Sequence, residues 1–430
     1  MVRVGRSRCA AGKGVAVGGR KAKVWTAAGG ARAAREARIG TARFLGEAPI
    51  ARAWQASRLM SDFEVKMETL SAQTDAGTAR SVAMSLLLGG LGYPMSWRPG
   101  HWMEVAERVL ADESRWLGEA DLYIVSPEMC DVVVAAAQTL TLEDLSLLSA
   151  DDLPSPSGVL VLPHPLLVRA INGNLGDDRA YHWHSPVELA VPDPAVGGFE
   201  RKPAVRFSVY HDTHGPVRPD SFLDVAAMAR AQGTPLPPFM LDAMRCWAFG
   251  QTTTEEQRRA LADFGEIARR TGRQAREEVQ ELGFEEERVI GEYTPGSEID
   301  DHDDTFAMRF LYAFWRLCEQ RIVVTDPAEV RHSARVAAAK AGVSPEVRVA
   351  RLRTTASPGE ADSGAGEPGR QWRHRWVVRM HKVRQWYPSE QRHKVIYRGP
   401  YPKGPADKPL LGGEEAMTSR WDRRVCSSPP

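Results

Sequence analysis

Four histidines and one aspartate of this chain have the residue types and the spacing of a metal site. His182 and His184 are two residues apart in a segment that alternates like a β-strand, so both belong to the same face of it. His211, Asp212 and His214 end another such segment. Imidazole and carboxylate groups are ligands for zinc and manganese. One hypothesis is therefore a hydrolase in which these five residues hold a divalent metal, although the chain has neither an HExxH helix nor a CxxC pair.

Arginines and aromatic residues alternate between residues 372 and 405, near the C-terminus. In extended strands alternate residues share a face, so Trp372 and Trp376 fall on one face and Arg373 and Arg375 on the other. Aromatic rings stack on bases and guanidinium groups hold phosphates, the combination that single-stranded nucleic acid requires. The sequence thus predicts a nucleic-acid surface made of Arg373, Arg375, Arg379, Lys382, Arg384, Trp386, Tyr387 and Lys403. The alternative is that the aromatic face packs on the rest of the protein, whose acidic residues pair with the arginines.

Residues 300–304 contain the string DDxxD, which holds magnesium against a diphosphate in isoprenoid synthases. Those enzymes are all-helical, whereas this chain has several strand-like segments. We expect Asp303 and Asp304 to cap a helix that starts at Thr305, because acids at a helix N-terminus are explained by capping and by the helix dipole. The chain also lacks a Walker lysine and a GxSxG elbow. These observations favour a binding protein over an enzyme.

The C-terminal stretch also carries a family resemblance. The order RWxVRxHxxxQWYPS, then H, then PYxKGP is met by Arg375, Trp376, Val378, Arg379, His381, Gln385–Ser389, His393, Pro400, Tyr401 and Lys403–Pro405. In this it resembles the C-terminus of a family of proteins from actinobacteria and their phages and plasmids, in which Gly often stands where this chain has Met380. The resemblance covers only part of the chain and implies no particular activity. A fainter similarity, to an anti-CRISPR protein that inhibits type V-A systems, implies a mobile-element protein acting on a nascent chain or a ribonucleoprotein.

Charge is distributed unevenly along the 430 residues. Residues 1–59 contain thirteen Lys and Arg against two acids, residues 370–430 fourteen against five, and residues 60–369 have 29 against 48. Two basic ends flanking an acidic body suggest contact with a polyanion or between parts of the chain. The longest mostly apolar stretch, 82–92, is too short to cross a bilayer, and five scattered cysteines fit reduced thiols. We therefore expect a cytoplasmic protein with no membrane segment.

Hydrophobic residues make up 43% of the chain and charged residues 26%, which excludes a wholly disordered protein. Periodicity predicts an α+β fold with a helical N-terminal part, an antiparallel sheet, a helical middle and a small basic-aromatic C-terminal β-sheet. The expected organisation is a basic tail (1–59, disordered or preceding a true start at Met60), a helical part (60–150), an antiparallel β part (151–215), a second helical part (216–345), a small β module (346–410) with a flexible insertion (354–370), and a disordered tail (411–430).

The function predicted from the sequence is binding without catalysis. The partner is nucleic acid or a ribonucleoprotein, contacted through the C-terminal sheet. Two alternatives stay open: the metal-dependent hydrolase described above, and a protein–protein module whose C-terminal sheet docks an acidic protein. No cofactor other than a divalent metal is indicated.

Overall fold

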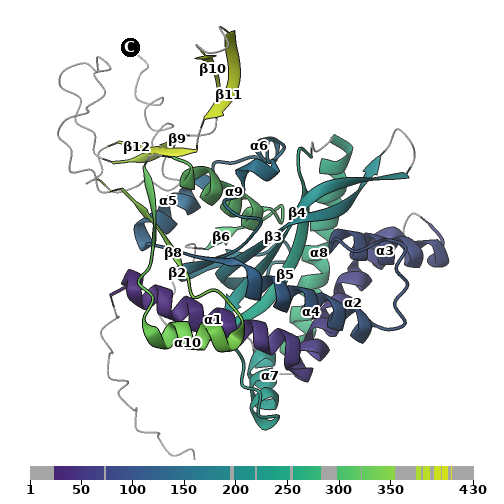
Figure 1. Cartoon of the computed structure of the whole chain (residues 1–430). Coiled ribbons are helices and arrows are strands. Elements are labelled where there is room, and N and C mark those ends of the chain that lie inside the picture. Colours follow the sequence, from purple (N-terminus) through teal and green to yellow (C-terminus); the bar gives the residue numbers. More distant parts are fainter. Residues whose placement is uncertain are drawn as a thin grey trace, which may run out of the picture.

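The computed structural model describes residues 24–71, 74–193, 198–217, 220–251, 255–281, 298–320, 322–353, 374–378, 381–387, 392–398, 400–404 and 408. It has the α+β fold that the sequence predicts, with one large sheet between two layers of helices (Figure 1). Within these ranges no helix combines the length and the apolar character that crossing a membrane requires.

The large sheet has the strand order β5-β4-β3-β2-β1-β8-β7, and the short β6 pairs with β2. Its strands are β1 (Asp121–Val125), β2 (Ser157–Arg169), β3 (Leu175–Asp193), β4 (Gly198–Asp212), β5 (Phe239–Ala248), β6 (Ile299–Asp300), β7 (Val323–Pro327) and β8 (Arg348–Leu352). The predicted antiparallel part, 151–215, corresponds to β2, β3 and β4, which are antiparallel neighbours. However, β1 pairs in parallel with both β2 and β8, so the sheet as a whole is mixed.

Strand β1 lies in the part of the chain that the sequence assigns to helices. Its last four residues are buried, because one helical layer covers each face of the sheet at this position. A strand that is buried on both faces shows a continuous apolar run instead of alternation. Such a short run cannot be distinguished from a piece of buried helix by its period, which is why the sequence does not reveal it.

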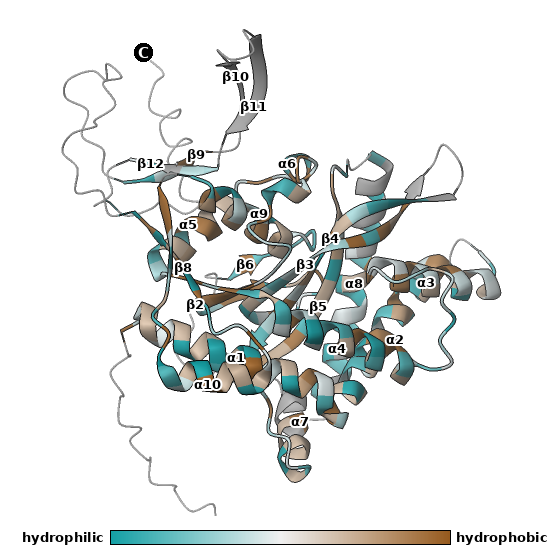
Figure 2. Ribbon diagram, viewed as in Figure 1, coloured by the Kyte–Doolittle hydropathy of each residue, from teal (hydrophilic) through white to brown (hydrophobic). Residues whose placement is uncertain are grey.

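The first helical layer covers one face of the sheet with apolar side chains of α1 to α4 and α7. The helices on this side are α1 (Ala27–Glu47), α2 (Pro49–Ser71), α3 (Ala76–Gly90), α4 (Trp102–Glu119) and α7 (Asp220–Ala231), with α8 (Glu255–Glu281) in contact with α2 and α10 (His332–Ala341) in contact with α1. Figure 2 shows hydrophobic segments along β2 and β8 and hydrophilic residues on α4 and α10. Helix α4 brings the charged side chain of Glu113 from this layer to the sheet, where it meets His182 and Arg206.

The second layer lies on the opposite face and is built around α9. It contains α5 (Pro127–Ala137), α6 (Leu142–Leu145), the short 3-10 helix η1 (Ala150–Asp152) and α9 (Phe306–Cys318). The stripe of Phe306, Phe310 and Phe314 is buried, as the sequence predicts, and Leu311 and Trp315 are buried as well. Helix α9 is therefore enclosed on most of its circumference and acts as the centre of the second core.

The prediction of a disordered tail over 1–59 is wrong for residues 27–59. Helix α1 buries Ala31 and Ala34 against the first core, and α2 begins at Pro49, eleven residues before Met60. The buried guanidinium of Arg38 donates to the carbonyl oxygens of Ala120 (3.0 Å) and Ser344. Alanine and arginine are strong helix formers, so an Ala- and Arg-rich composition suits a helix as well as a tail.

The predicted C-terminal β module, 346–410, is also different in the structure. Strand β8 lies inside the large sheet, between β1 and β7, and not beside the C-terminal strands. The remaining strands form two separate pairs: β9 (Trp376–Val378) with β12 (Tyr401–Lys403), and β10 (His381–Tyr387) with β11 (Arg392–Arg398). The predicted insertion, 354–370, and the predicted tail, 411–430, lie outside the described residues. Strand pairing was misjudged because alternation identifies a strand but not its neighbour.

Candidate functional site

The five predicted metal ligands belong to two separate groups. His182 and His184 of β3 both face α4, as their spacing predicts. Nδ1 of His182 lies 2.8 Å from Oε1 of Glu113, and the ring of His184 stacks on Trp116 with the centroids 4.1 Å apart. His211, further along on β4, contacts a different set of residues.

The remaining two predicted ligands have partners of their own. Oδ2 of Asp212 lies 3.1 Å from Nε of Arg179, and its Oδ1 accepts a hydrogen bond from the backbone N–H of His214, whose side chain is exposed. Within the described ranges, no group of three or more His, Cys, Asp or Glu side chains is arranged to hold a metal ion. The register between β3 and β4 decides which side chains come into contact, and this register cannot be read from the spacing of residues in the sequence.

Glu113 of α4 is the centre of a buried polar network that the sequence analysis missed. Its side chain is completely buried, and Oε1 accepts hydrogen bonds from Tyr210 (2.6 Å) and from His182. Nη2 of Arg206 lies 3.6 Å from Oε2. Burial opposes the charge of this carboxylate, but His182, Arg206 and the Tyr210 hydroxyl outweigh it and lower the pKa of Glu113 to about 2. A charged carboxylate is thus held between a helix and the sheet.

Arg206 of β4 connects this network to the molecular surface. Its guanidinium lies 4.9 Å from the ring centroid of Trp116 and 5.6 Å from that of Tyr93, so it is enclosed by two aromatic rings. Nη1 donates to the hydroxyl of Tyr93 at 3.3 Å, and that hydroxyl donates to Oδ2 of Asp112 at 3.0 Å. The chain of contacts from Glu113 through Arg206 therefore reaches Tyr93, a half-buried residue at the edge of a pocket, and continues to Asp112.

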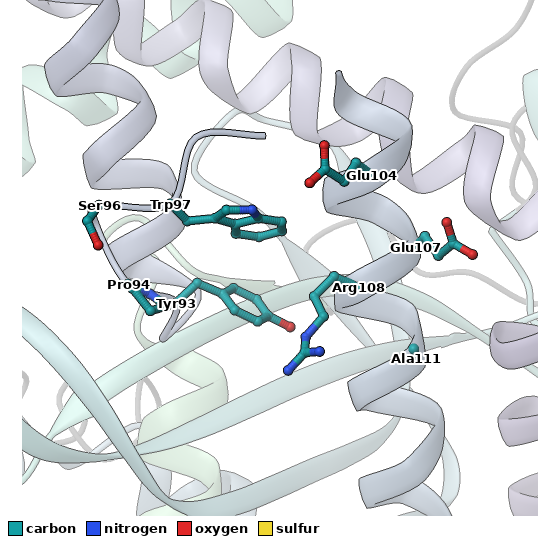
Figure 3. Close-up of a pocket in the computed structure, with 8 residues that line it drawn as sticks. All are labelled: Tyr93, Pro94, Ser96, Trp97, Glu104, Glu107, Arg108 and Ala111. Carbon is teal, nitrogen blue, oxygen red and sulfur yellow. The ribbon is translucent and has the colours of Figure 1, made fainter. Parts of the chain in front are cut away.

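This pocket lies between the segment 93–97 and helix α4 and has a volume of about 680 Å³. Figure 3 shows the ring of Trp97 above that of Tyr93, with the charged side chains of α4 across the cavity from them. Two aromatic rings and a few charged groups around a space of this size are typical of a small-ligand site. The lining residues are Tyr93, Pro94, Ser96, Trp97, Glu104, Glu107, Arg108 and Ala111.

The second group of titratable residues surrounds His211. Its Nε2 lies 3.2 Å from Asp242, which also pairs with Arg58 at 2.6 Å, and its Nδ1 lies 3.7 Å from Asp177 and 3.8 Å from Asp178. Burial raises the pKa of Asp177 to about 7 and that of Asp178 to about 6. Burial alone would lower the pKa of His211, but the neighbouring carboxyl groups raise it to about 9. The pKa values of the two neighbouring carboxyl groups are thus shifted toward neutral pH.

The aspartates at 300–304 serve helix α9, as the sequence predicts, but the capping residue is a different one. Oδ1 of Asp301 accepts hydrogen bonds from the backbone N–H groups of Thr305 and Phe306, each at 3.0 Å. Asp303 and Asp304 were expected in this role; instead they form ion pairs, Asp303 with Arg309 at 2.8 Å and Asp304 with Arg245 at 3.1 Å.

The predicted nucleic-acid residues are divided between the two C-terminal strand pairs. Nε of Arg375, next to β9, donates to the carbonyl oxygen of Lys408 at 2.9 Å, and Val377 packs against the second core. This face of β9 is thus turned to the body of the protein, and Lys403 of β12 is exposed. Lys382, Arg384, Trp386 and Tyr387 all belong to β10, whereas Arg373 and Arg379 lie outside the described residues.

Glu113 could have been found from the sequence by its position. It follows Val105 and Val109 at intervals of four residues, in the apolar stripe of α4, and both valines are buried. A charged residue in such a stripe needs a buried partner. Arg206 similarly interrupts the alternating strand 204–211, but neither residue indicates that the other is its partner.

Comparison of the chain with models of protein families, with curated proteins and with solved structures finds no match. The family resemblances drawn from the C-terminal residues therefore stay predictions from the sequence.

Proposed function

We propose that this protein binds single-stranded nucleic acid in the cytoplasm, through one face of the hairpin formed by β10 and β11. The observation that carries the proposal is the register of this hairpin. Lys382 is opposite Tyr397, Arg384 is opposite Val395, and Trp386 is opposite His393. Directly opposite residues of an antiparallel pair share a face, as do alternate residues along each strand. Three of the residues predicted to contact nucleic acid therefore belong to one face.

The charge of the two strands supports the same function. They contain five Lys and Arg residues and no Asp or Glu: Lys382, Arg384, Arg392, Lys394 and Arg398. A basic surface with aromatic residues binds a single strand by holding its phosphates while its bases stack. In the register of the two strands, Tyr397 and His393 occupy positions on the same face as Lys382 and Trp386.

The proposed contact surface is smaller than the surface predicted from the sequence. Arg375 is half-buried and bonded to a backbone carbonyl group, so we assign it a structural role. Tyr387 pairs with Arg392 and belongs to the other face of the hairpin. The contact residues proposed here are Lys382, Arg384, Trp386, His393 and Tyr397.

The test is a salt titration of binding, measured by fluorescence anisotropy with labelled single- and double-stranded DNA and RNA. The whole chain is used, because α1 and α2 belong to the first core. The double variant Lys382→Ala/Arg384→Ala removes two phosphate contacts, so the slope of log K against log salt flattens by about 1.4 for a single strand. Trp386→Ala removes one stacking ring and weakens binding by about 1 to 3 kcal/mol, and Trp386→Phe restores part of the loss.

The matched control is Arg392→Ala/Lys394→Ala, which removes the same charge from the opposite face of the same hairpin. It keeps most of the affinity if one face makes the contact. Equal losses in the two double variants would contradict the assignment to that face. If the whole chain binds no nucleic acid at low salt, the proposed function is wrong, and an acidic protein partner becomes the hypothesis to pursue.

A further inference from the structure

We propose that the pocket between residues 93–97 and helix α4 binds an organic cation, an alkylammonium or guanidinium group, which stacks on Trp97 and pairs with Glu104. This site is far from the C-terminal hairpin in the chain and is independent of the proposed nucleic-acid binding. The proposal depends on the aromatic wall of the pocket, on the charge balance of its lining and on its size.

The aromatic wall is held in place by the backbone of its own loop. The rings of Tyr93 and Trp97 are tilted by 57° with their centroids 5.6 Å apart. The N–H of Tyr93 donates to the carbonyl oxygen of Leu88, and the N–H of Trp97 to that of Pro94, each at 2.9 Å. Gly92 precedes them with a φ of +79°, a backbone conformation that residues other than glycine rarely adopt. The two rings are thus positioned before any ligand arrives.

Trp97 is the ring that a ligand cation can use. Tyr93 already has the guanidinium of Arg206 near its ring, at 5.6 Å from the centroid. Among the described residues no Lys or Arg has this relation to Trp97, and Arg98 instead donates to the carbonyl oxygens of Met95 and Trp97 itself. Tryptophan attracts cations most strongly of the aromatic side chains, through the negative face of its ring.

The charge balance of the lining leaves one carboxylate for the ligand. Of the charged residues around the pocket, Arg108 pairs with Asp112 at 3.0 Å and Glu107 lies 3.6 Å from Arg52. Within the described part of the chain no Lys, Arg or His pairs with Glu104. Figure 3 shows the side chain of Glu104 extending from α4 toward the side of the pocket where the ring of Trp97 lies.

Glu104 is also fixed in position. One of its oxygens, Oε2, accepts a hydrogen bond from the backbone N–H of Gly100 at 2.7 Å, which ties the side chain to the turn before α4. A carboxylate that is fixed and lacks a counter-ion attracts a cation at a lower entropic cost than a freely moving one. A volume of about 680 Å³ accommodates a polyamine or the side chain of a lysine or arginine.

The test is isothermal titration of the whole, nucleic-acid-free protein with two probes: spermidine, and a glycine-serine peptide with one central arginine. Binding of either cation supports the proposal. Spermidine alone would identify a free polyamine as the ligand, and the peptide alone would identify a side chain of a partner protein. Glu104→Gln keeps the acceptor for the Gly100 N–H but removes the charge, and Trp97→Ala removes the ring; each weakens binding by about tenfold or more.

Two variants guard against misreading. Trp97→Phe retains an aromatic face and recovers part of the affinity, and it replaces Trp97→Ala if the latter does not fold. Glu119→Gln removes the same charge from an exposed position at the other end of α4, outside the pocket lining, and leaves the affinity within about twofold. The proposal is overturned if neither probe binds, or if Glu119→Gln weakens binding as much as Glu104→Gln does.

Discussion

His182 on β3 and Glu113 on α4 are joined by a hydrogen bond of 2.8 Å between two side chains that are almost completely buried. This contact and the neighbouring ion pair with Arg206 lie between the first helical layer and the sheet, next to the apolar side chains of the first core. Buried polar groups of this kind stabilise only the arrangement in which all of them find partners. We infer that they set the position of α4 along the sheet, and with it the position of the pocket at Tyr93.

Replacing Glu113 tests this role. Glu113→Gln keeps the shape and an acceptor for Tyr210 but leaves Arg206 without its carboxylate, so we expect the free energy of unfolding to fall by about 3 kcal/mol. Urea unfolding at neutral pH measures the loss. Glu107→Gln, an exposed change on the same helix, alters stability by no more than about 0.5 kcal/mol. Similar effects of the two substitutions would show that the buried charge contributes nothing specific.

The pH dependence of the Asp177 group provides a second prediction. The pKa of Asp177, about 7, lies above its ordinary value of 3.8, because burial disfavours the charged form. The native state therefore keeps a proton that the unfolded chain loses, so this stabilisation is present below pH 3.8 and is lost as the pH rises to about 7. His211 also stabilises the native state through a raised pKa, from 6.5 to about 9, and this contribution is present below pH 6.5 and is lost as the pH rises to about 9.

In the wild type, Oδ2 of Asp177 accepts a hydrogen bond from the backbone N–H of Val217 at 3.2 Å. Asp177→Asn removes the titrating carboxyl group but keeps an oxygen that can accept this hydrogen bond. We expect the variant to be more stable than the wild type above pH 7, by about 2 kcal/mol, and to match it in acid. Urea unfolding at a series of pH values measures both. Parallel curves for the two proteins would mean that Asp177 has an ordinary pKa.

Arg38 tests whether the N-terminal helix is part of the fold. Its guanidinium bonds to carbonyl oxygens of Ala120 and Ser344, which are far from it in the chain. Arg38→Ala leaves these acceptors without their donor, and we expect a loss of about 3 kcal/mol in thermal or urea unfolding. Arg32→Ala, at an exposed position of the same helix, serves as the control and should be nearly neutral. An equally small effect of Arg38→Ala would show that the contacts of α1 with Ala120 and Ser344 do not contribute to the stability of the fold.

Local periodicity predicted several helices and strands correctly, but it did not predict which elements pair or pack with one another. The strands around His182 and His211 and the aromatic stripe of α9 were predicted, because each is recorded in the spacing of adjacent side chains. Strand β1 and the place of β8 were missed, because a short apolar run has no distinctive period and pairing is not a local property. Helix α1 was missed because its many arginines resemble those of a basic tail, and two of them are in fact buried.

The sequence by itself determined the α+β class, the shared face of His182 and His184 and the charge of the C-terminal strands. These properties depend on the order of neighbouring residues, which the backbone converts directly into faces of helices and strands. Only the tertiary structure decided that Glu113 meets His182 and Arg206, that Arg38 meets Ser344, and that Trp97 faces α4 across a pocket. Each of these contacts joins separate elements, and their pairing is selected by the packing of the whole core, which no local pattern of residues contains.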